Sequence, residues 1–257
     1  MQESSWNKGP DHSEHEIFSQ LRVPPDAPFF VRLDGRRFRA VSETVEAEKP
    51  FDKRFAQCLV ASAMGVFQSG FNPALVYVAS DELNVLFLYA VPFRRRVEKI
   101  NSILAGIASS SFSLNTLKLF KKSLTASFDS RIVVSSKEKI VEYLLWRQRE
   151  AWRNHNNAYG YWLLRRRGHK PREAARMLKG LKTKGLHEML FRNGVNLAQT
   201  PAWQRRGILV HREPYQKQVE NHTVTRWRVK ENWDLPLFSS TEGQILIQQI
   251  LDWSKPK

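Results

Sequence analysis

Six segments between residues 29 and 134 follow one another in an order that few folds accommodate. Apolar, β-branched and aromatic runs predict strands at 29–34, 74–79, 83–90 and 131–134. Apolar residues at helical spacing predict helices at 52–68, with Asp52 as N-cap, and at 93–110. The resulting β-α-β-β-α-β order predicts an α+β, ferredoxin-like core, in which two helices pack on one face of an antiparallel sheet. Polymerase palms share this layout with many unrelated domains, so the layout alone assigns no function.

The composition changes after residue 135. A long helix is predicted at 137–166 and ends in the basic turn Arg165-Arg166-Arg167 before Gly168. Further elements are predicted as helices at 171–179, 184–192 and 242–253 and as strands at 206–212 and 223–229. A polar loop is expected after the first strand, and a loop or short helix at 111–127. We therefore expect a flexible tail at 1–14, a core at 15–135, and a basic, mainly helical extension at 136–257 packed on the core as one unit.

Two of the predicted strands end in carboxylates. The first strand leads into Asp34-Gly35, and the hairpin between the next two has Ser80-Asp81-Glu82 at its tip. Taken separately, each is most simply a turn. In a split βαβ fold, however, the first and third strands are central neighbours, so the two ends should meet. Two carboxylates and a backbone carbonyl at that point can hold two Mg²⁺ ions.

Cations and amides occur near the same segments. Arg36, Arg37 and Arg39 follow Asp34 directly and can meet phosphates there, although a solvated basic loop is the alternative. Arg96 and Lys99 are three residues apart on one helical face and can hold a triphosphate, with a solvated face as the alternative. A run containing three asparagines in the long helix, 154–157, indicates either a polar site or a helix break.

The charge balance favours a polyanionic partner. The chain of 257 residues has 41 Lys and Arg against 25 Asp and Glu, a formal net charge of +16. Nucleic acid is favoured over a membrane surface, because no long basic amphipathic helix is apparent. The single cysteine, Cys58, excludes an intramolecular disulfide and a cysteine-based zinc site, and its apolar neighbours indicate a packed core thiol. The first 16 residues lack an apolar signal region and no apolar run approaches about 20 residues, so the cytoplasm is expected.

Several short motifs, in this order, resemble the tRNA-histidine guanylyltransferase family, including its guanylyltransferase-like branch of 3′–5′ RNA polymerases. The matching motifs span about 15–212 and are Val31-Arg32-Leu33-Asp34-Gly35-Arg36, Ser80-Asp81-Glu82, Phe128-Asp129-Ser130-Arg131, Trp146-Arg147-Gln148, His187-Glu188-Met189-Leu190-Phe191 and Arg206-Gly207-Ile208-Leu209-Val210. The resemblance implies a polymerase-palm-like catalytic core that adds nucleotides to the 5′ end of tRNA. The tRNA 5′-monophosphate is first activated with ATP or GTP, and the 3′-hydroxyl of an incoming nucleotide then attacks it.

The resemblance also implies roles for particular residues. Asp34 and Asp81, with the carbonyl of Gly35, are expected to bind two Mg²⁺ ions, and the adjacent Glu82 is included in this metal site. Nucleotide contacts are expected from Asp34, Gly35, Arg36, Arg37, Phe38, Arg39, Ser80 and Asp81, and triphosphate contacts from Arg96, Lys99 and Asn154. Weaker tRNA contacts are expected from Arg165, Arg166, Arg167, Lys182, Lys184, Arg205 and Arg206. A dimer or tetramer of the chain is also implied.

Three positions differ from the eukaryotic guanylyltransferases. Arg39 and Trp152 stand where those enzymes have histidines, and Leu186 stands where they have a lysine. These differences favour template-directed extension of 5′-truncated tRNA, with guanylate addition to tRNA-histidine as the alternative. A non-catalytic RNA-binding module and a nucleotide cyclase are more distant alternatives. The first lacks its usual aromatic signature in the predicted strands, and the second leaves the excess of arginine unexplained.

Overall fold

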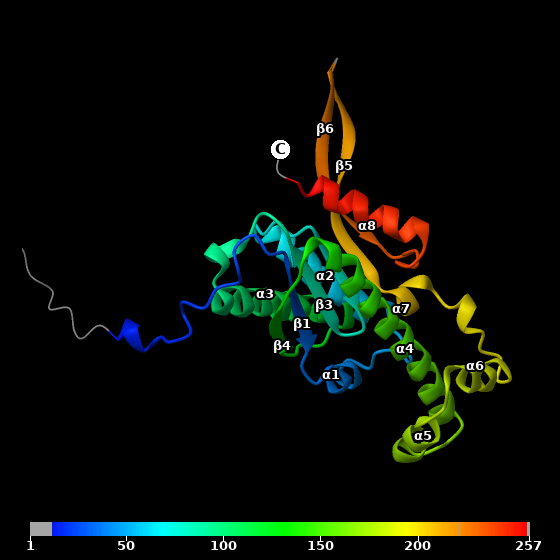
Figure 1. Ribbon diagram of the computed structural model, residues 1–257. Helices are drawn as coiled ribbons and strands as arrows, with labels where there is room; N and C mark the ends of the chain where they lie inside the picture. Colours follow the sequence, from blue (N-terminus) through cyan, green and yellow to red (C-terminus); the bar gives the residue numbers. More distant parts are fainter. Residues whose placement is uncertain (1–11, 221, 256–257) are drawn as a thin grey trace, which may run out of the picture.

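A single antiparallel sheet organises the chain. The computed structural model describes residues 12–220 and 222–255 (Figure 1), so most of the predicted tail at 1–14 lies outside the described residues. The sheet has the strand order β4-β1-β3-β2-β5-β6. The strands are β1 (Phe29–Gly35), β2 (Leu75–Ala79), β3 (Glu82–Phe87), β4 (Phe128–Val134), β5 (Ile208–Val219) and β6 (His222–Asn232). The mixed α+β class and the central position of the first and third strands are confirmed.

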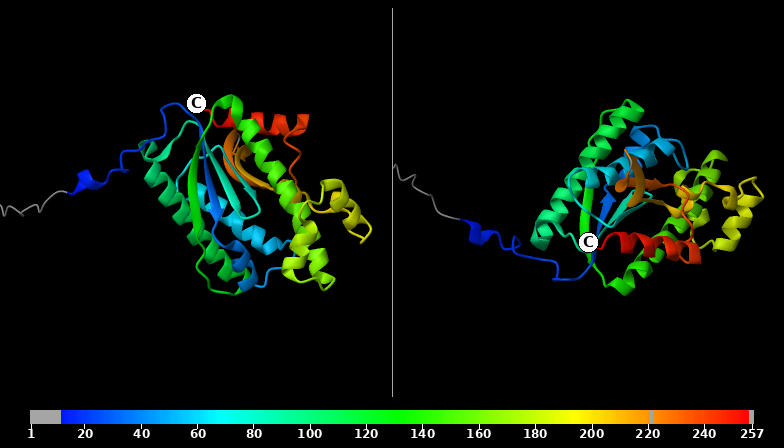
Figure 2. Two further views of the ribbon diagram at one scale, coloured as in Figure 1. Left: turned by 60° about the horizontal axis from the view of Figure 1, so that its bottom comes forward. Right: turned by 90° about the horizontal axis from the view of Figure 1, so that it is seen from above.

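Helices cover both faces of this sheet (Figure 2). Strand residues alternate between the faces, and in β1 Phe29, Val31 and Leu33 join the core under α2 (Lys53–Gln68) and α3 (Val97–Phe120). Phe30 lies in a second core, to which α4 (Ile140–Arg166) and α8 (Thr241–Trp253) contribute. The sequence predicted the first of these layers. The second layer comes from the extension, and β5 of the extension pairs with β2 of the core.

Two predictions for α2 are confirmed, the N-cap at Asp52 and the buried thiol of Cys58. The Asp52 side chain accepts a hydrogen bond from the backbone N–H of Arg54 at 2.8 Å and so satisfies a donor at the helix start. It also accepts one from the N–H of Glu48, in the loop before the helix, at 2.9 Å. Cys58 is fully buried in the same helix. Burial raises the pKa of its thiol to about 11, which leaves it protonated and unreactive at neutral pH.

The predicted helix at 93–110 is wrong at both ends. It begins at Val97, after the short helix η2 (Pro92–Arg95), where Phe93 and Arg94 have positive φ angles. It ends at Phe120, so the predicted loop at 111–127 is mostly helix. Serines are poor helix formers because their hydroxyls compete with the backbone. Here the hydroxyls of Ser109 and Ser113 accept hydrogen bonds from the backbone N–H groups of Phe128 and Ala126 at 3.1 and 3.0 Å, which ties this part of the helix to the segment that leads into β4. Over the described residues, α3 alone is long and apolar enough to span a bilayer, yet it packs on α2 and β4.

Other boundaries also differ from the predictions. The polar loop after Asp34-Gly35 contains the helix α1 (Phe38–Thr44). Its seven residues, about two turns, are too few to show a periodic apolar face. β4 begins three residues earlier than predicted, and β5 and β6 form a longer hairpin that projects beyond the sheet (Figure 1). α4 is unbroken through its asparagines, so the predicted alternative of a helix break at 154–157 is wrong.

Three short helices follow α4. They are α5 (Pro171–Leu178), α6 (Thr183–Phe191) and α7 (Ala202–Arg206). The first two agree with the predicted helices, and together with the final turns of α4 they build a small separate core around Leu186 and Leu190. Residues of α4, α5 and α7 lie across a cavity from α1 and the start of α2.

Candidate active site

The carboxylates at the ends of β1 and the β2–β3 turn come together as predicted. Asp34 lies opposite Glu82 in the antiparallel register, and the backbone N–H of Gly35 donates to the carbonyl of Asp81 at 2.9 Å. This hydrogen bond extends the pairing one step past the strand and fixes the turn against the end of β1. Asp34 and Asp81 therefore share one edge of the sheet.

The electrostatics of this edge suit a divalent cation. Burial raises the pKa of Asp81, and the negative charge of Asp34 raises it further. A bound cation would relieve both effects, because it favours the ionised carboxylates. Carboxylate and carbonyl oxygens are the ligands that Mg²⁺ prefers, so the donors present at Asp34, Gly35 and Asp81 fit this ion. Within residues 12–220 and 222–255, no group of three or more His, Cys, Asp or Glu side chains is arranged to hold a metal.

A cavity of about 720 Å³ opens beside Asp81, a volume in the range of small-molecule sites. Its walls come from α1, the start of α2, the β2–β3 turn, α4 and α7. Five residues predicted from the sequence to bind nucleotide or triphosphate line it: Phe38, Arg39, Ser80, Asp81 and Asn154. The cavity also exposes aromatic rings suited to a nucleobase, namely Phe51, Tyr161, Trp162 and Trp203.

Two cations on the cavity wall can meet phosphate oxygens. Arg39 donates to the hydroxyl of Tyr161 at 3.3 Å and to the carboxylate of Glu43 at 3.2 Å. Lys49 donates to the hydroxyl of Ser42 at 2.6 Å, and burial lowers the pKa of this lysine. The sequence predicted Arg39 but not Lys49, which lies in the segment interpreted as a plain loop.

Other predicted residues are placed elsewhere. Arg36 and Arg37 are exposed beyond the end of β1 and do not line the cavity. Arg96 and Lys99 do not line the cavity either. Arg96 pairs through its backbone with Arg22 ahead of β1, and Lys99 Nζ lies 5.8 Å from the centroid of the Phe93 ring. The structure therefore places both cations outside the group of predicted residues that line the cavity.

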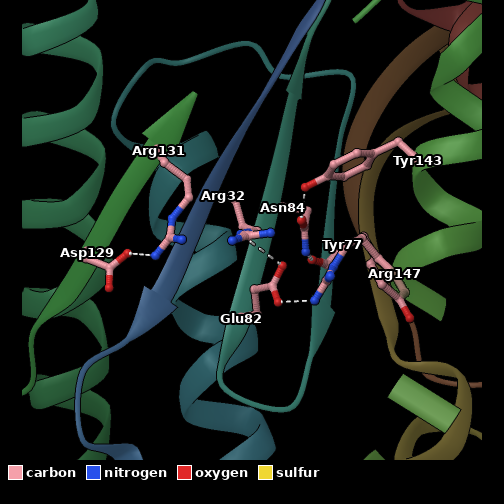
Figure 3. A network of polar contacts seen from close by, with 8 residues as sticks. All are labelled: Arg32, Tyr77, Glu82, Asn84, Asp129, Arg131, Tyr143 and Arg147. Atoms are coloured by element: carbon pink, nitrogen blue, oxygen red, sulfur yellow. Dashed lines mark hydrogen bonds and ion pairs between the residues drawn. The ribbon is translucent and has the colours of Figure 1, made fainter. Parts of the chain in front are cut away.

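Glu82 has partners of its own. It is buried on the face of the sheet that α4 covers, with Arg32 Nε 3.8 Å from its carboxylate and Arg147 donating to it from α4 (Figure 3). Burial raises the pKa of Glu82, while the two arginines lower it. The sequence motifs contained both arginines, but their spacing gave no sign that they would meet this carboxylate.

The cations predicted to contact tRNA fall into two groups. Arg165, Arg205 and Arg206 are half-buried and donate to the backbone carbonyls of His169, Thr200 and Leu235, respectively. These bonds tie chain segments together. Arg166, Arg167, Lys182 and Lys184 are exposed, with Arg166 donating to the carbonyl of Lys49 at the cavity rim. Only these four exposed cations are free to contact RNA as predicted, and their role stays a prediction.

Ala158 and Tyr161 of α4 line the cavity beside Asn154, although the sequence analysis did not identify them. Asn154 and Ala158 are four residues apart, and Tyr161 follows three residues later, so all lie on one helical face. Counting from Asn154 at helical spacing would have found them. The neighbouring Asn156 instead faces the interior, where its amide nitrogen lies 3.2 Å from His187 Nε2.

A buried histidine in this wall gives a pH prediction. His155 is fully buried, and its ring nitrogens lie 3.0 Å from Asn156 and 2.9 Å from Thr200. Burial lowers the pKa of His155 from 6.5 to about 4. The unfolded chain therefore binds a proton that the folded chain does not between these values, and stability falls as the pH falls. We expect a loss of about 2 kcal/mol between pH 7 and pH 5 from this residue, measured by urea unfolding.

His211 serves as the internal comparison for that measurement. Burial also lowers the pKa of His211, so the wild-type slope contains both contributions. A His155→Gln variant should unfold more easily at pH 7 but lose less stability on acidification than the wild type. An unchanged slope in this variant would show that His155 is not the titrating group.

Comparison with known proteins identifies the family. Residues 12–136 match the family described as tRNAHis guanylyltransferase, and residues 138–243 match the family described as Thg1 C terminal domain. The chain is 31% identical over 205 residues to the probable tRNA(His) guanylyltransferase of Dictyostelium discoideum, covering 76% of this chain and 79% of that protein. It is 30% identical over 201 residues to the tRNA(His) guanylyltransferase of Schizosaccharomyces pombe, covering 75% and 76% of the two chains.

Solved structures show the same fold. A bacterial tRNA(His) guanylyltransferase-like protein in complex with ATP superposes with a TM-score of 0.73 at 24% identity, over 93% of this chain and 96% of the other. The tRNA(His) guanylyltransferase of Saccharomyces cerevisiae gives a TM-score of 0.70 at 26% identity, over 78% and 92% of the two chains. Two consecutive family matches and relatives of this similarity lead to one conclusion: the chain belongs to the tRNA(His) guanylyltransferase family.

Proposed function

We propose that this chain is a nucleotidyltransferase that adds guanylate to the 5′ end of tRNA-histidine. The observation that carries the proposal is the cavity at the sheet edge, where Asp81, Arg39 and Asn154 line a space of nucleotide size beside Asp34. Family membership supplies the reaction class, since the relatives described above are guanylyltransferases of that tRNA. The ferredoxin-like order of β1 to β4, with the site at one strand end, is consistent with a polymerase-palm-like core.

The residues of the site divide the work. Asp34 and Asp81, with the carbonyl of Gly35, would hold two Mg²⁺ ions, which when bound stabilise the charge that develops on the reacting phosphate. Arg39 and Lys49 contact the phosphates of the nucleotide in the cavity, and the aromatic rings of Tyr161 and Trp203 receive its base. ATP or GTP would occupy this cavity during activation, as the bacterial structural relatives were solved in complex with each. The 3′-hydroxyl of the incoming nucleotide then displaces the activating group from the tRNA 5′ phosphate.

Template-directed extension of 5′-truncated tRNA is the second candidate. It is supported by the three positions that differ from the eukaryotic enzymes. Arg39 points into the cavity wall toward Tyr161, and Trp152 stacks on the buried His155 with ring centroids 5.4 Å apart. Leu186, the third position, is buried and presents no cation to a substrate. In this alternative the opposing strand of the tRNA selects the incoming base.

The two candidates are separated by one comparison of substrates. Full-length tRNA-histidine and a tRNA lacking its first 5′ nucleotide are each supplied as the 5′-monophosphate with ATP, labelled GTP and Mg²⁺. We expect guanylate addition to the full-length tRNA opposite its unpaired position, at a rate at least about tenfold above that for other full-length tRNAs. Faster repair of the truncated tRNA, with the added base changing when the opposing base changes, would replace the first candidate by the second. Absence of product with both would overturn the proposed function.

A further inference from the structure

A cluster of buried charges lies next to the carboxylates without lining the cavity. Glu82, Arg32 and Arg147 have side chains only 10%, 18% and 13% exposed, respectively. In the same part of the sheet, the pair Asp129–Arg131 is about half exposed, at 54% and 51%. Figure 3 shows the three buried residues and the Asp129–Arg131 pair on the same face of the sheet, which α4 partly covers. The three residues therefore form a buried ion-pair cluster, unlike the solvated Asp129–Arg131 pair.

The register places Glu82 directly beside Asp34. Asp34 lies opposite Glu82 on β3 and opposite Asp129 on β4, so three carboxylates form one row across the sheet. Like charges directly opposite one another are unfavourable. Arg32, two residues before Asp34 on the same face, and Arg147 both engage the Glu82 carboxylate. Glu82 is thereby neutralised and held by its partners.

The partner on α4 belongs to a row of residues that runs along β3 toward the turn. Tyr143 donates to Asn84 at 2.6 Å, and one helical turn later Arg147 donates to Glu82, two residues earlier on β3. Arg147 and Asn154 are seven residues apart, about two helical turns, and so lie on the same face of α4. Asn154 lines the cavity together with Asp81. The ion pair between Arg147 and Glu82 thus joins the cavity wall to the turn that carries Asp81.

Several buried polar atoms of the cluster make no hydrogen bond of their own. Arg32 Nε, Arg147 Nε and Glu82 Oε1 are buried and have no hydrogen-bond partner among residues 12–220 and 222–255. Arg147 is further held by the ring of Trp146, 4.5 Å from its guanidinium carbon. Arg32 and Arg147 thus hold Glu82 from β1 and from α4. Removal of Glu82 would leave two buried guanidinium groups without the carboxylate they share, and removal of Arg147 would detach Glu82 from α4.

We propose that Arg147 is a positioning residue, which acts through Glu82 to hold the Asp81 turn in register with the nucleotide-binding face of α4. On this view Glu82 anchors the turn and is not one of the metal ligands, in contrast to the role that the sequence predicted for it. The inference rests on the proposed nucleotidyl transfer for its kinetic readout. Because Arg147 aligns other groups and does not contact the substrate, its loss should lower kcat and leave nucleotide affinity nearly unchanged.

The test compares Arg147→Met, Arg147→Lys, Glu82→Gln and the double variant Glu82→Gln/Arg147→Met with the wild type. Single-turnover rates should fall by about 100-fold in each of the two uncharged single variants, while KM for GTP changes less than about threefold. The double variant should be no slower than the slower single variant, because the two residues act through each other. Arg147→Lys should recover part of the rate. Arg131→Met, which removes the exposed partner of Asp129, is the matched control and should leave the rate within about twofold.

Mg²⁺ titrations distinguish the anchor from a ligand. Tryptophan fluorescence, with Trp162 and Trp203 in the cavity wall, reports GTP binding as Mg²⁺ is raised. Glu82→Gln should leave the half-saturating Mg²⁺ concentration within about threefold of the wild type. A rise of tenfold or more would make Glu82 a metal ligand and overturn the proposal, as would additive rate losses in the double variant.

A further readout does not depend on the reaction. Hydrogen exchange of residues 80–82 and 150–158 should accelerate in Arg147→Met, return toward the wild type in Arg147→Lys, and stay unchanged in Arg131→Met. If the wild type binds GTP but transfers nothing to tRNA, the proposed function fails while this measurement still decides the role of Arg147. Unchanged exchange in Arg147→Met would refute the positioning role whatever the activity.

Discussion

Replacing Asp34 or Asp81 by Asn is expected to slow nucleotide addition by about a thousandfold or more. Each change keeps the shape of the side chain but removes the charge of one of the two carboxylates expected to bind Mg²⁺. A bound Mg²⁺ contributes several kcal/mol to stabilising the transition state, and each 1.4 kcal/mol corresponds to about a tenfold change in rate. Single-turnover assays with 5′-activated tRNA and labelled GTP measure the addition step without the activation step.

The two variants should also differ in a way that the electrostatics predict. The charge of Asp34 contributes to the raised pKa of Asp81, so Asp34→Asn should lower the pKa of Asp81 toward its ordinary value. Folded-state stability should therefore not fall in Asp34→Asn, and removal of the like-charge repulsion should raise it slightly. Thermal unfolding without Mg²⁺ tests this expectation.

Asp129→Asn is the matched control for both variants. Asp129 flanks Asp34 on the neighbouring strand, but its carboxylate is about half exposed and pairs with Arg131 at 2.6 Å. Its loss should change the rate by less than about threefold. Normal addition by Asp34→Asn and Asp81→Asn would show that the metal assignment is wrong, and an equal loss in Asp129→Asn would show that the effect is one of general charge.

The framework of the fold was predictable because its elements have strong local signals. The strands at β1, β2 and β3 are runs of apolar residues, and α2 combines helical spacing with the Asp52 cap. The errors occur where local signals conflict with tertiary packing. The second half of α3 is rich in serine, yet Phe112 and Thr116 are fully buried there, so packing on α2 extends the helix past its weak sequence. α1 is held mainly by the burial of Phe38, and a single buried residue gives no periodic pattern from which a helix could be predicted.

The candidate site was predictable in part for a similar reason. Adjacency of Asp34 and Asp81 follows from strand order alone, because the first and third strands are neighbours in this topology. The partners of Glu82 do not follow, since Arg147 reaches it from a helix 65 residues later in the chain. Lys49 and Trp203 reach the cavity from a loop and from a short helix, and no spacing rule connects such segments. Three-dimensional packing alone defines those contacts.

Gly35→Ala is expected to destabilise the protein by about 3 kcal/mol and to slow nucleotide addition by about a hundredfold. A Cβ atom at this position would lie 2.5 Å from two carbon atoms of the Phe38 ring. That ring cannot move aside easily, because it packs against Phe112 and Phe128 with centroids 4.8 and 4.9 Å away. The clash must therefore displace the backbone at the end of β1, which carries Asp34 and the carbonyl expected to bind Mg²⁺.

Gly106→Ala provides a control of opposite sign for the Gly35→Ala variant. Gly106 lies in α3, and a Cβ atom there would meet nothing within 4 Å. Alanine in place of this helical glycine should stabilise the protein by about 1 kcal/mol and leave the addition rate unchanged, as urea unfolding and single-turnover assays can show. In the Gly35→Ala background, Phe38→Leu should restore part of the lost stability, because the smaller side chain leaves room for the added methyl group. A Gly35→Ala variant as stable and active as the wild type would mean that this end of β1 adapts freely, and the carboxylate edge would then lack the rigid support from Phe38 that makes a preorganised metal site.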